Sequence, residues 1–322
     1  MSFIEMLCLV LAAVYASTCV LLSIGVALIW HAALERRRHG SAELLTLRLA
    51  PPAGAAFLTL TVALPAFLIH EPHHDAEPVG PLLGLLAVFA LYSVGSGILR
   101  GFRAWAATRA LLRRCRPADR GPADRGPAER GPVSAEFDVL DDREPLAAVV
   151  GAWRPRILAA DCVREALSDE EFLQVIAHET AHVAARDNVK LLLQIISPDA
   201  LTWMPAGTAL TQRWRAAAEL EADARAVGLD HAKRLALASA LLKVARLSTA
   251  TEHGSLALRM SAADDVAARV RQLLAPLPMP SGRLPMRTLV ACLLLIAVIG
   301  VPLYGSVHEC IESLVTFGSL SE

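Results

Sequence analysis

Hydrophobic residues are gathered into four long runs along the chain, separated by stretches rich in charged residues. A helix of about 20 apolar residues is long enough to cross the hydrocarbon core of a bilayer. The four runs approach or exceed that length: Ile4–Trp30, Leu49–Ile69, Pro81–Leu99 and Thr288–Tyr304. The pattern predicts four transmembrane helices, three before a long polar segment and one after it.

The first run resembles a retained span more than a cleaved signal peptide. No Lys or Arg precedes it, it is longer than a signal sequence, and no small-residue cleavage site follows it. In the second run, Pro51 and Pro52 stand at the start of the predicted helix, and Pro65 is expected to kink it.

Basic residues fall on one side of these spans. Arginines are concentrated in the loop 31–48, in the stretch that follows the third span and just before the fourth, whereas the loop 70–80 carries acidic residues and no Lys or Arg. Because cytoplasmic loops carry the excess of Lys and Arg, the N-terminus is expected outside and the segment 100–287 in the cytoplasm. We therefore expect a multi-pass protein of the cytoplasmic (inner) membrane with both termini outside.

Residues 116–133 are dominated by the repeat Pro-Ala-Asp-Arg-Gly and contain almost no large apolar side chain. Such a stretch cannot bury a core, which predicts a flexible linker. The expected domains are therefore 1–115 with three spans, the linker, a cytoplasmic domain at 134–282, and 283–322 with the fourth span and a short extracytoplasmic tail.

The cytoplasmic domain begins with short strand-like runs and continues with helical patterns. The predicted strands are Phe137–Leu140, Ala147–Val150 and Arg156–Ala159. The predicted helices start at Ser168, Thr208, His231 and Ser261; Ser168 with Glu171, and Ser261 with Asp264, have the spacing of capping boxes, and Gly228 suits a helix end. This order indicates an α+β arrangement.

Composition agrees with a membrane protein. Hydrophobic residues make up 54% of the chain, and the mean hydropathy is +0.44. The formal net charge of −1 gives no reason to expect direct binding of nucleic acid. None of the six cysteines forms a C-x-x-C pair, so neither a disulfide framework nor a cysteine zinc site is expected. Three histidines (His70, His73 and His74) crowd the acidic outer loop, where a solvated loop is a simpler interpretation than a metal or pH sensor.

Residues 178–182 read His-Glu-Thr-Ala-His. On a helix, His178 and His182 share one face, so both can direct a ring nitrogen at one Zn²⁺, while Glu179 is placed to reach a water molecule on the metal. Two exposed histidines on an amphipathic helix are the simpler alternative. Apolar neighbours on both sides of the motif weaken that alternative, because burying unpartnered ionisable groups is costly.

A catalytic zinc site needs a third protein ligand, and three acidic residues follow at Glu219, Glu221 and Asp223. Glu219 and Asp223 share a helix face, so one of them can bind zinc while the other holds a ligand histidine. Spacing alone leaves Glu219 and Glu221 hard to separate, and a solvated acidic face remains an alternative.

The stretch from about Glu136 to Asn188, including Gly151-Ala-Trp-Arg-Pro-Arg-Ile157 and the histidine motif with its following Arg-Asp, resembles the BlaR/MecR-type membrane zinc metallopeptidases. It is more distantly similar to HtpX-like and CAAX-prenyl proteases. The resemblance implies an α-helical membrane protein of four spans with an inserted α+β, zincin-like cytoplasmic metallopeptidase domain. It further implies one Zn²⁺ held by His178, His182 and Glu219, with Asp223 behind a histidine, Glu179 as general base, and a structural ion-pair role for Arg186 and Asp187.

The resemblance also suggests an endopeptidase that cleaves a cytoplasmic DNA-binding repressor, or itself, in a signalling role. The penicillin-binding sensor domain of the antibiotic-sensing members is not expected here, since only about residues 305–322 follow the fourth span. An HtpX-like housekeeping protease and a catalytically silent membrane scaffold remain alternatives. We expect the substrate to lie along an edge strand at Arg156–Ala159, and His231 is a weak candidate for stabilising an oxyanion.

Overall fold

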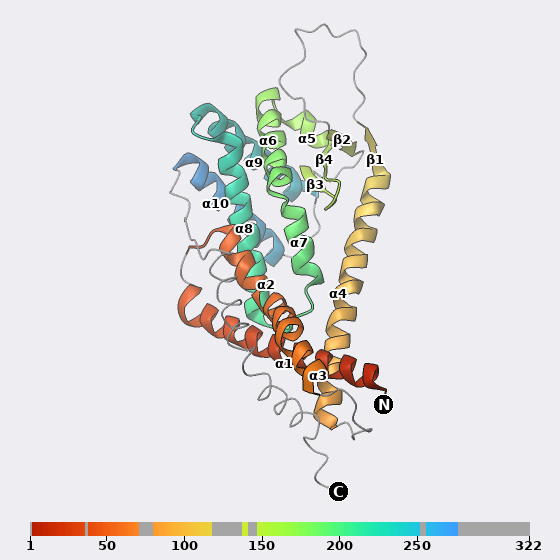
Figure 1. The fold of residues 1–322 in the computed structure, drawn as a ribbon. Coiled ribbons are helices and arrows are strands. Elements are labelled where there is room, and N and C mark those ends of the chain that lie inside the picture. The colour runs from red at the N-terminus through yellow and green to blue at the C-terminus, as the bar shows by residue number, and fades with distance from the viewer. Residues whose placement is uncertain are drawn as a thin grey trace. The chain divides into compact units, whose positions relative to one another are not determined.

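The computed structural model describes residues 2–35, 38–70, 80–117, 137–140, 147–251 and 256–275. In this part of the chain most residues are helical, and the chain divides into two compact units (Figure 1). Residues 1–101 and 194–214 belong to the first, the bundle unit; residues 102–193 and 215–280 belong to the second, the sheet unit. The linker repeat after Pro117, the loop 71–79, the predicted fourth span and the C-terminal tail lie outside the described residues.

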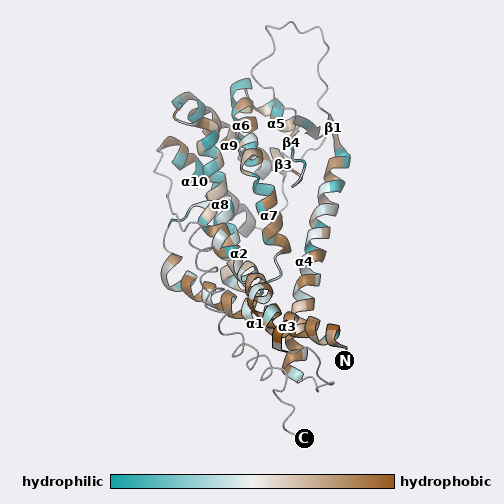
Figure 2. Ribbon diagram, in the orientation of Figure 1, coloured by the Kyte–Doolittle hydropathy of each residue, from teal (hydrophilic) through white to brown (hydrophobic). Residues whose placement is uncertain are grey.

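The bundle unit contains three helices that are long and apolar enough to cross a membrane: Phe3–Ala32, Ser41–Ile69 and Pro81–Arg114. They correspond to α1 (Phe3–Ile29) with η1 (Trp30–Leu34), to α2 (Ser41–Leu58) with η2 (Thr59–Ala63) and α3 (Leu64–His70), and to α4 (Pro81–Arg114). Brown, hydrophobic residues predominate along α1 and α3 in Figure 2. The first three predicted spans are confirmed as candidates, and the chain is a membrane protein by this criterion.

The second of these helices starts earlier than its apolar run. It begins at Ser41, so Pro51 and Pro52 lie inside α2 rather than at its start, and Arg48 is a buried helical residue. The irregularity expected at Pro65 is the π-helical turn η2 that ends just before it. Proline has no N–H to donate to the preceding turn, and a π turn is one way in which a helix accommodates a lost hydrogen bond.

Two packing features hold the bundle unit together. Its apolar core joins α1, η2, α3 and α4 through Val10, Ala13, Ala63, Phe67 and Leu83. In addition, residues 194–214 belong to this unit, although they lie between residues of the sheet unit in the sequence. They comprise the end of α7 (Asp187–Ile196), the 3₁₀ turn η3 (Ala200–Trp203) and the start of α8 (Pro205–Val227). The sequence pattern did not indicate this excursion.

The sheet unit is built on four short strands in the order β1-β2-β4-β3. β2 (Phe137–Leu140), β3 (Ala147–Val150) and β4 (Arg156–Ala160) confirm the three predicted strands, and β1 (Cys115–Pro117) adds the first two residues of the predicted linker. β2 pairs with β4 in parallel, and the other pairs are antiparallel. The prediction that Arg156–Ala159 is an edge strand is wrong, because the parallel pairing with β2 places β4 inside the sheet and leaves β3 at the edge.

Helices complete the sheet unit: α5 (Asp161–Ala166), α6 (Asp169–Ala185), the second part of α8, α9 (His231–Thr251) and α10 (Leu256–Leu274). The capping box of Ser168 and Glu171 at the start of α6 is confirmed, and Gly228 ends α8 with φ +54°. Ser261 lies inside α10, so its predicted role as a cap is wrong; the helix begins five residues earlier. The sequence analysis missed α5 and α7.

Helix α6 packs against β3 and β4, and α9 packs against α6. Their shared core contains Ile157, Val163, Phe172, Ile176 and Ala240, and a second cluster joins α8, α9 and α10. Glu171, already the capping residue of α6, also accepts hydrogen bonds from Ser239 and Lys243 of α9 at 2.6 and 2.7 Å. The helix that carries the histidine motif is therefore fixed at its first turn and along its buried face.

Candidate metal centre

Helix α6 places His178 and His182 one turn apart, on the same face. The helix is uninterrupted from Asp169 to Ala185 and ends where Arg186 adopts a left-handed conformation, φ 56°. His178 is buried and His182 is half-buried. The Nε2 atoms of the two rings lie 3.1 Å apart, which means that both rings converge on one point.

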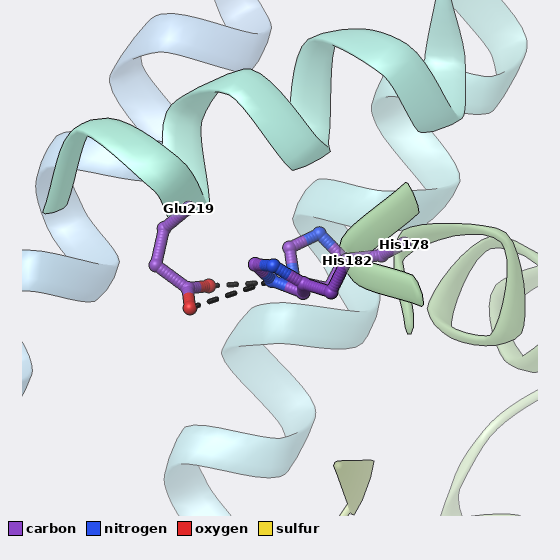
Figure 3. A group of neighbouring side chains, drawn as sticks. All are labelled: His178, His182 and Glu219. Carbon is purple, nitrogen blue, oxygen red and sulfur yellow. Dashed lines mark hydrogen bonds and ion pairs between the residues drawn. The ribbon is translucent and has the colours of Figure 1, made fainter. Parts of the chain in front are cut away.

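Glu219, from α8, supplies a carboxylate at that same point (Figure 3). Its oxygens lie 3.3 Å from Nε2 of His178 and 3.5 Å from Nε2 of His182. In a tetrahedral zinc site with bonds of about 2.0–2.1 Å, any two ligand atoms are about 3.3–3.4 Å apart. The distance to His178 is from Oε2 of Glu219 and that to His182 is from Oε1, and one ligand atom from each of the three residues lies within 4.8 Å of the other two. The described residues therefore form a group that can hold a metal ion.

Each histidine of the group has a carboxylate on its other ring nitrogen. Asp223 lies 2.9 Å from Nδ1 of His178, and Asp187 lies 2.8 Å from Nδ1 of His182. A carboxylate at Nδ1 favours a proton on that nitrogen and leaves Nε2 with a free lone pair. Both histidines are therefore held in the tautomer that suits metal binding through Nε2.

Arg269, from α10, connects the acidic residues of this site. Its guanidinium donates two hydrogen bonds to Asp223, at 2.8 and 2.7 Å, and forms an ion pair with Glu219 at 2.9 Å. The bidentate pair fixes the Asp223 carboxylate against His178. Arg269 thus joins three helices, α6, α8 and α10, around one point.

The electrostatics of the site favour a cation. Burial by itself lowers the pKa of His182, but hydrogen bonds with Asp187 and Glu219 outweigh it and raise that pKa to about 10. For Glu219, burial is outweighed by the two histidines and Arg269, which hold its pKa well below the usual range. The same carboxylates that retain a proton on the imidazoles would retain a metal ion in its place.

Charge balance points to a divalent ion. Asp223 is neutralised by Arg269, and Asp187 by Lys190 at 2.8 Å. Glu219 and Glu179 are the two carboxylates left over, and a dication would balance both. The donor set of two imidazoles and one carboxylate, with an open fourth position, suits zinc.

Glu179 is the neighbour of the first histidine and is buried beside the group. Burial is the largest influence on its pKa, which is raised despite the nearby histidines. A carboxyl group whose pKa is raised toward neutrality is suited to take up and release a proton.

The other acidic and basic candidates have different roles. Glu221 is not part of the group of His178, His182 and Glu219, and it pairs with Arg225 at 3.0 Å. Asp187 forms an ion pair with Lys190 and also contacts Nδ1 of His182. Arg186 ends α6, and His231 is exposed at the start of α9.

Three residues of the site were missed by the sequence analysis: Arg269, Asp187 as a histidine partner, and Asn188. Asn188 donates two hydrogen bonds to carbonyls of the edge strand, those of Val149 and Gly151, at 2.9 and 3.0 Å. Asp187 and Asn188 could have been suspected from their position directly after the histidine helix. Arg269 lies 87 residues after His182, and its sequence context contains no comparable signal.

Residues 143–273 match the family model described as BlaR1 peptidase M56. This span contains the histidine motif, Glu219, Asp223 and Arg269, and it confirms the resemblance to the BlaR/MecR-type peptidases. No curated protein and no solved structure matches the chain.

Proposed function

We propose that this chain, whose residues 143–273 match the BlaR1 peptidase M56 family model, is an integral-membrane, zinc-dependent endopeptidase with a zincin-like catalytic domain. The observation that carries the proposal is the convergence of His178, His182 and Glu219 on one point beside the buried carboxyl of Glu179. A bare pair of surface histidines would have neither the third donor nor the carboxylates behind each ring.

The protein residues have separable tasks in this mechanism. When bound, zinc supplies Lewis acidity, which acidifies water and polarises a carbonyl group. His178, His182 and Glu219 hold it through Nε2 and carboxylate oxygens, while Asp223 and Asp187 keep each ring in the required tautomer. Arg269 keeps Asp223 ionised and in place.

Glu179 acts as the general base and then as the general acid. It takes the proton of the attacking water at its carboxylate and delivers it to the nitrogen of the leaving amine. Its raised pKa makes the second of these steps easier, because the protonated carboxyl persists closer to neutral pH.

The substrate is a protein segment in an extended conformation. The edge strand β3 packs against α6, which carries the histidines, and an edge strand can pair with an added strand. Asn188 holds the carbonyls of Val149 and Gly151, which fixes this edge relative to the first turn of α7. We therefore assign substrate pairing to β3 and not to β4.

The arginines are concentrated on one side of the spans, and cytoplasmic loops carry the excess of Lys and Arg. We therefore expect the protein to lie in the inner membrane with its catalytic domain in the cytoplasm. Regulatory cleavage of a cytoplasmic DNA-binding repressor, or of the chain itself, suits that location. Comparing proteins in wild-type and Glu179→Gln cells separates this role from housekeeping. One cytoplasmic protein that ceases to be clipped supports regulation, whereas many stabilised membrane proteins indicate an HtpX-like role.

Replacing Glu179 by Gln tests the mechanism in the full chain reconstituted in lipid. We expect casein cleavage to fall about 10²–10⁴-fold because the proton acceptor is lost, while zinc measured by atomic absorption stays near one per chain. Glu170→Gln is the matched control, an exposed glutamate on the same helix, and it should retain wild-type activity. Wild-type turnover by Glu179→Gln would contradict the assignment.

His178→Ala tests the metal site itself. Loss of one of three protein ligands should remove zinc and activity together, and added zinc should no longer raise the unfolding temperature as it does for the wild-type chain. Full zinc content in this variant would place the metal elsewhere.

A further inference from the structure

The distribution of polar and apolar side chains in residues 194–207 is the reverse of that in a water-exposed loop. The exposed side chains of this segment are Ile196, Trp203 and Pro205, all apolar. Its buried polar side chains are Gln194, Ser197 and Asp199. A surface loop in water exposes its charged and amide groups, whereas a segment in lipid must turn them inward.

The backbone of the segment is satisfied by side chains of the bundle. Arg100 of α4 donates to the carbonyls of Ile195 and Ser197 at 2.7 and 3.0 Å, and Tyr15 of α1 donates to the carbonyl of Pro198 at 3.0 Å. Non-helical backbone is tolerated at membrane depth only where protein groups take the place of water. The bundle provides those groups for the carbonyl of Ile195 in the last turn of α7 and for those of Ser197 and Pro198, which follow the helix.

A buried ion pair fixes the turn of the segment. Asp199 and Arg48 of α2 lie 2.7 Å apart, with side chains 0% and 4% exposed. Ser197 and Thr202 donate further hydrogen bonds to the Asp199 carboxylate at 2.5 and 3.2 Å, and Arg48 also donates to Thr202 at 2.9 Å. Ionisable residues within membrane segments pair with one another in this way.

Contacts with two helices indicate how deep the segment lies. Trp203 stacks on Tyr92 and meets Phe89 edge-on, with ring centroids 5.7 and 5.8 Å apart. Phe89 and Tyr92 lie about 12 and 17 Å from the start of α4, and the hydrocarbon core of a bilayer is about 30 Å thick. Tyr15, which bonds to Pro198, lies about 18 Å along α1.

Small residues permit this close approach. A Cβ atom at Gly97 would overlap the carbonyl oxygen of Ile196, and one at Gly207 would overlap that of Leu201. Glycine at helix contacts lets backbones meet closely inside membranes. The backbone of the segment therefore contacts α4 closely at Gly97 and contacts the start of α8 closely at Gly207.

We infer that residues 194–207 form a re-entrant membrane segment, which leaves the sheet unit near the end of α7, enters the hydrocarbon of the bilayer and returns to the same side through α8. Its partner is the acyl-chain region of the lipid, which meets Ile196, Trp203 and Pro205. The inference concerns membrane contact and does not depend on peptidase activity.

A single-tryptophan chain that keeps Trp203 and replaces the others with Phe tests the inference in nanodiscs containing lipids brominated at mid-chain. We expect several-fold quenching of Trp203 fluorescence. The matched chain that keeps Trp153, which is 82% exposed in the sheet unit, should be unaffected. Quenching of Trp203 by aqueous iodide but not by brominated lipid would overturn the inference.

A second measurement guards against disruption of the bundle by those replacements. A spin label at Ile196→Cys, in a chain without native cysteines, should respond to oxygen more than to an aqueous nickel chelate, like a label at Leu91→Cys on the exposed side of α4. A response like that of Leu229→Cys, an exposed site in the sheet unit, would reject membrane insertion. An inactive chain that meets both expectations would contradict the proposed peptidase and leave this inference intact.

Discussion

Two buried polar clusters in this protein differ in whether their charges are balanced by their own residues. The bundle cluster of Arg48, Asp199, Ser197 and Thr202 pairs one cation with one anion and bonds both to hydroxyls. The metal cluster of His178, His182, Glu219, Asp223 and Arg269 brings two ring nitrogens and a carboxylate oxygen to one point. The first cluster balances its two charges internally, although Nε of Arg48 has no hydrogen-bond partner among the described residues. The second brings together lone pairs and negative charge that call for a cation.

This difference separates structural from chemical use of buried charge. A closed network stabilises one packing of the chain and gains nothing from a ligand. A network whose lone pairs converge is stabilised only when a metal ion or protons occupy it. Variants of the two clusters should therefore fail in different assays.

The largest effect on stability is expected for Asp199→Asn, which leaves Arg48 buried without its counter-ion. Breaking a buried ion pair costs about 3–5 kcal/mol, measurable as a shift in detergent-induced unfolding. Zinc affinity should stay unchanged. Arg164→Gln, which breaks an exposed pair with Asp169, is the control and should cost less than about 1 kcal/mol.

Replacing both partners of the bundle pair sharpens this test. Arg48→Met with Asp199→Leu removes the charges together, and apolar replacement of a buried pair is often neutral or stabilising. We expect the double variant to recover most of the loss. A double variant as unstable as Asp199→Asn would show that the hydroxyl partners, and not the charges, determine stability.

An intermediate effect is expected for Asp187→Asn, which weakens the carboxylate behind His182. Zinc affinity, measured against a chromogenic chelator, should fall about 10–100-fold, as for other carboxylates that orient a ligand histidine. Asp169→Asn, at the exposed start of the same helix, should bind zinc normally. Equal zinc affinities for Asp187→Asn and Asp169→Asn would show that Asp187 has only a structural role.

The smallest effect is expected for Glu171 of the sheet unit, whose carboxylate accepts hydrogen bonds from Ser168, Ser239 and Lys243. Burial alone would raise its pKa, but Lys243, Ser239 and the backbone of Ser168 lower it from 4.5 to about 2. Its stabilisation, about 1–2 kcal/mol after allowance for the exposed Lys243, is present above pH 4.5 and lost as the pH falls toward 2. Glu171→Gln should remove this part of the acid dependence of unfolding, and zinc should not alter it.

Much of the metal cluster could be predicted from sequence because its parts are local. Helical periodicity alone places His178 and His182 on one face, and the capping box at Ser168 correctly locates the start of α6. The choice between Glu219 and Glu221 needed either the family resemblance or the structure. Arg269 depends on how α10 packs against α8, which no local pattern encodes.

The bundle cluster could not be predicted, because its residues come from distant parts of the chain. In the sequence, Arg48 is the last residue of a basic loop that indicates the orientation of the spans, and nothing near Asp199 indicates that it is buried. Only the tertiary fold shows that α2 begins before Arg48 and that Asp199 meets it 151 residues later. The edge-strand prediction failed for a similar reason, since the parallel partner of β4 is chosen by topology and not by composition.

The two units cannot be separated by a single cut, because the chain passes through the bundle unit between His182 and Glu219. The residues of the metal cluster do not belong to one uninterrupted stretch of the sheet unit, because residues 194–214, between His182 and Glu219, belong to the bundle unit. A fragment that keeps both α6 and α8 also keeps the apolar surface of Ile196 and Trp203, now facing water. Producing the sheet unit as a soluble fragment therefore requires redesign of residues 194–214, and the choice of detergent or lipid becomes a variable in any assay of metal binding.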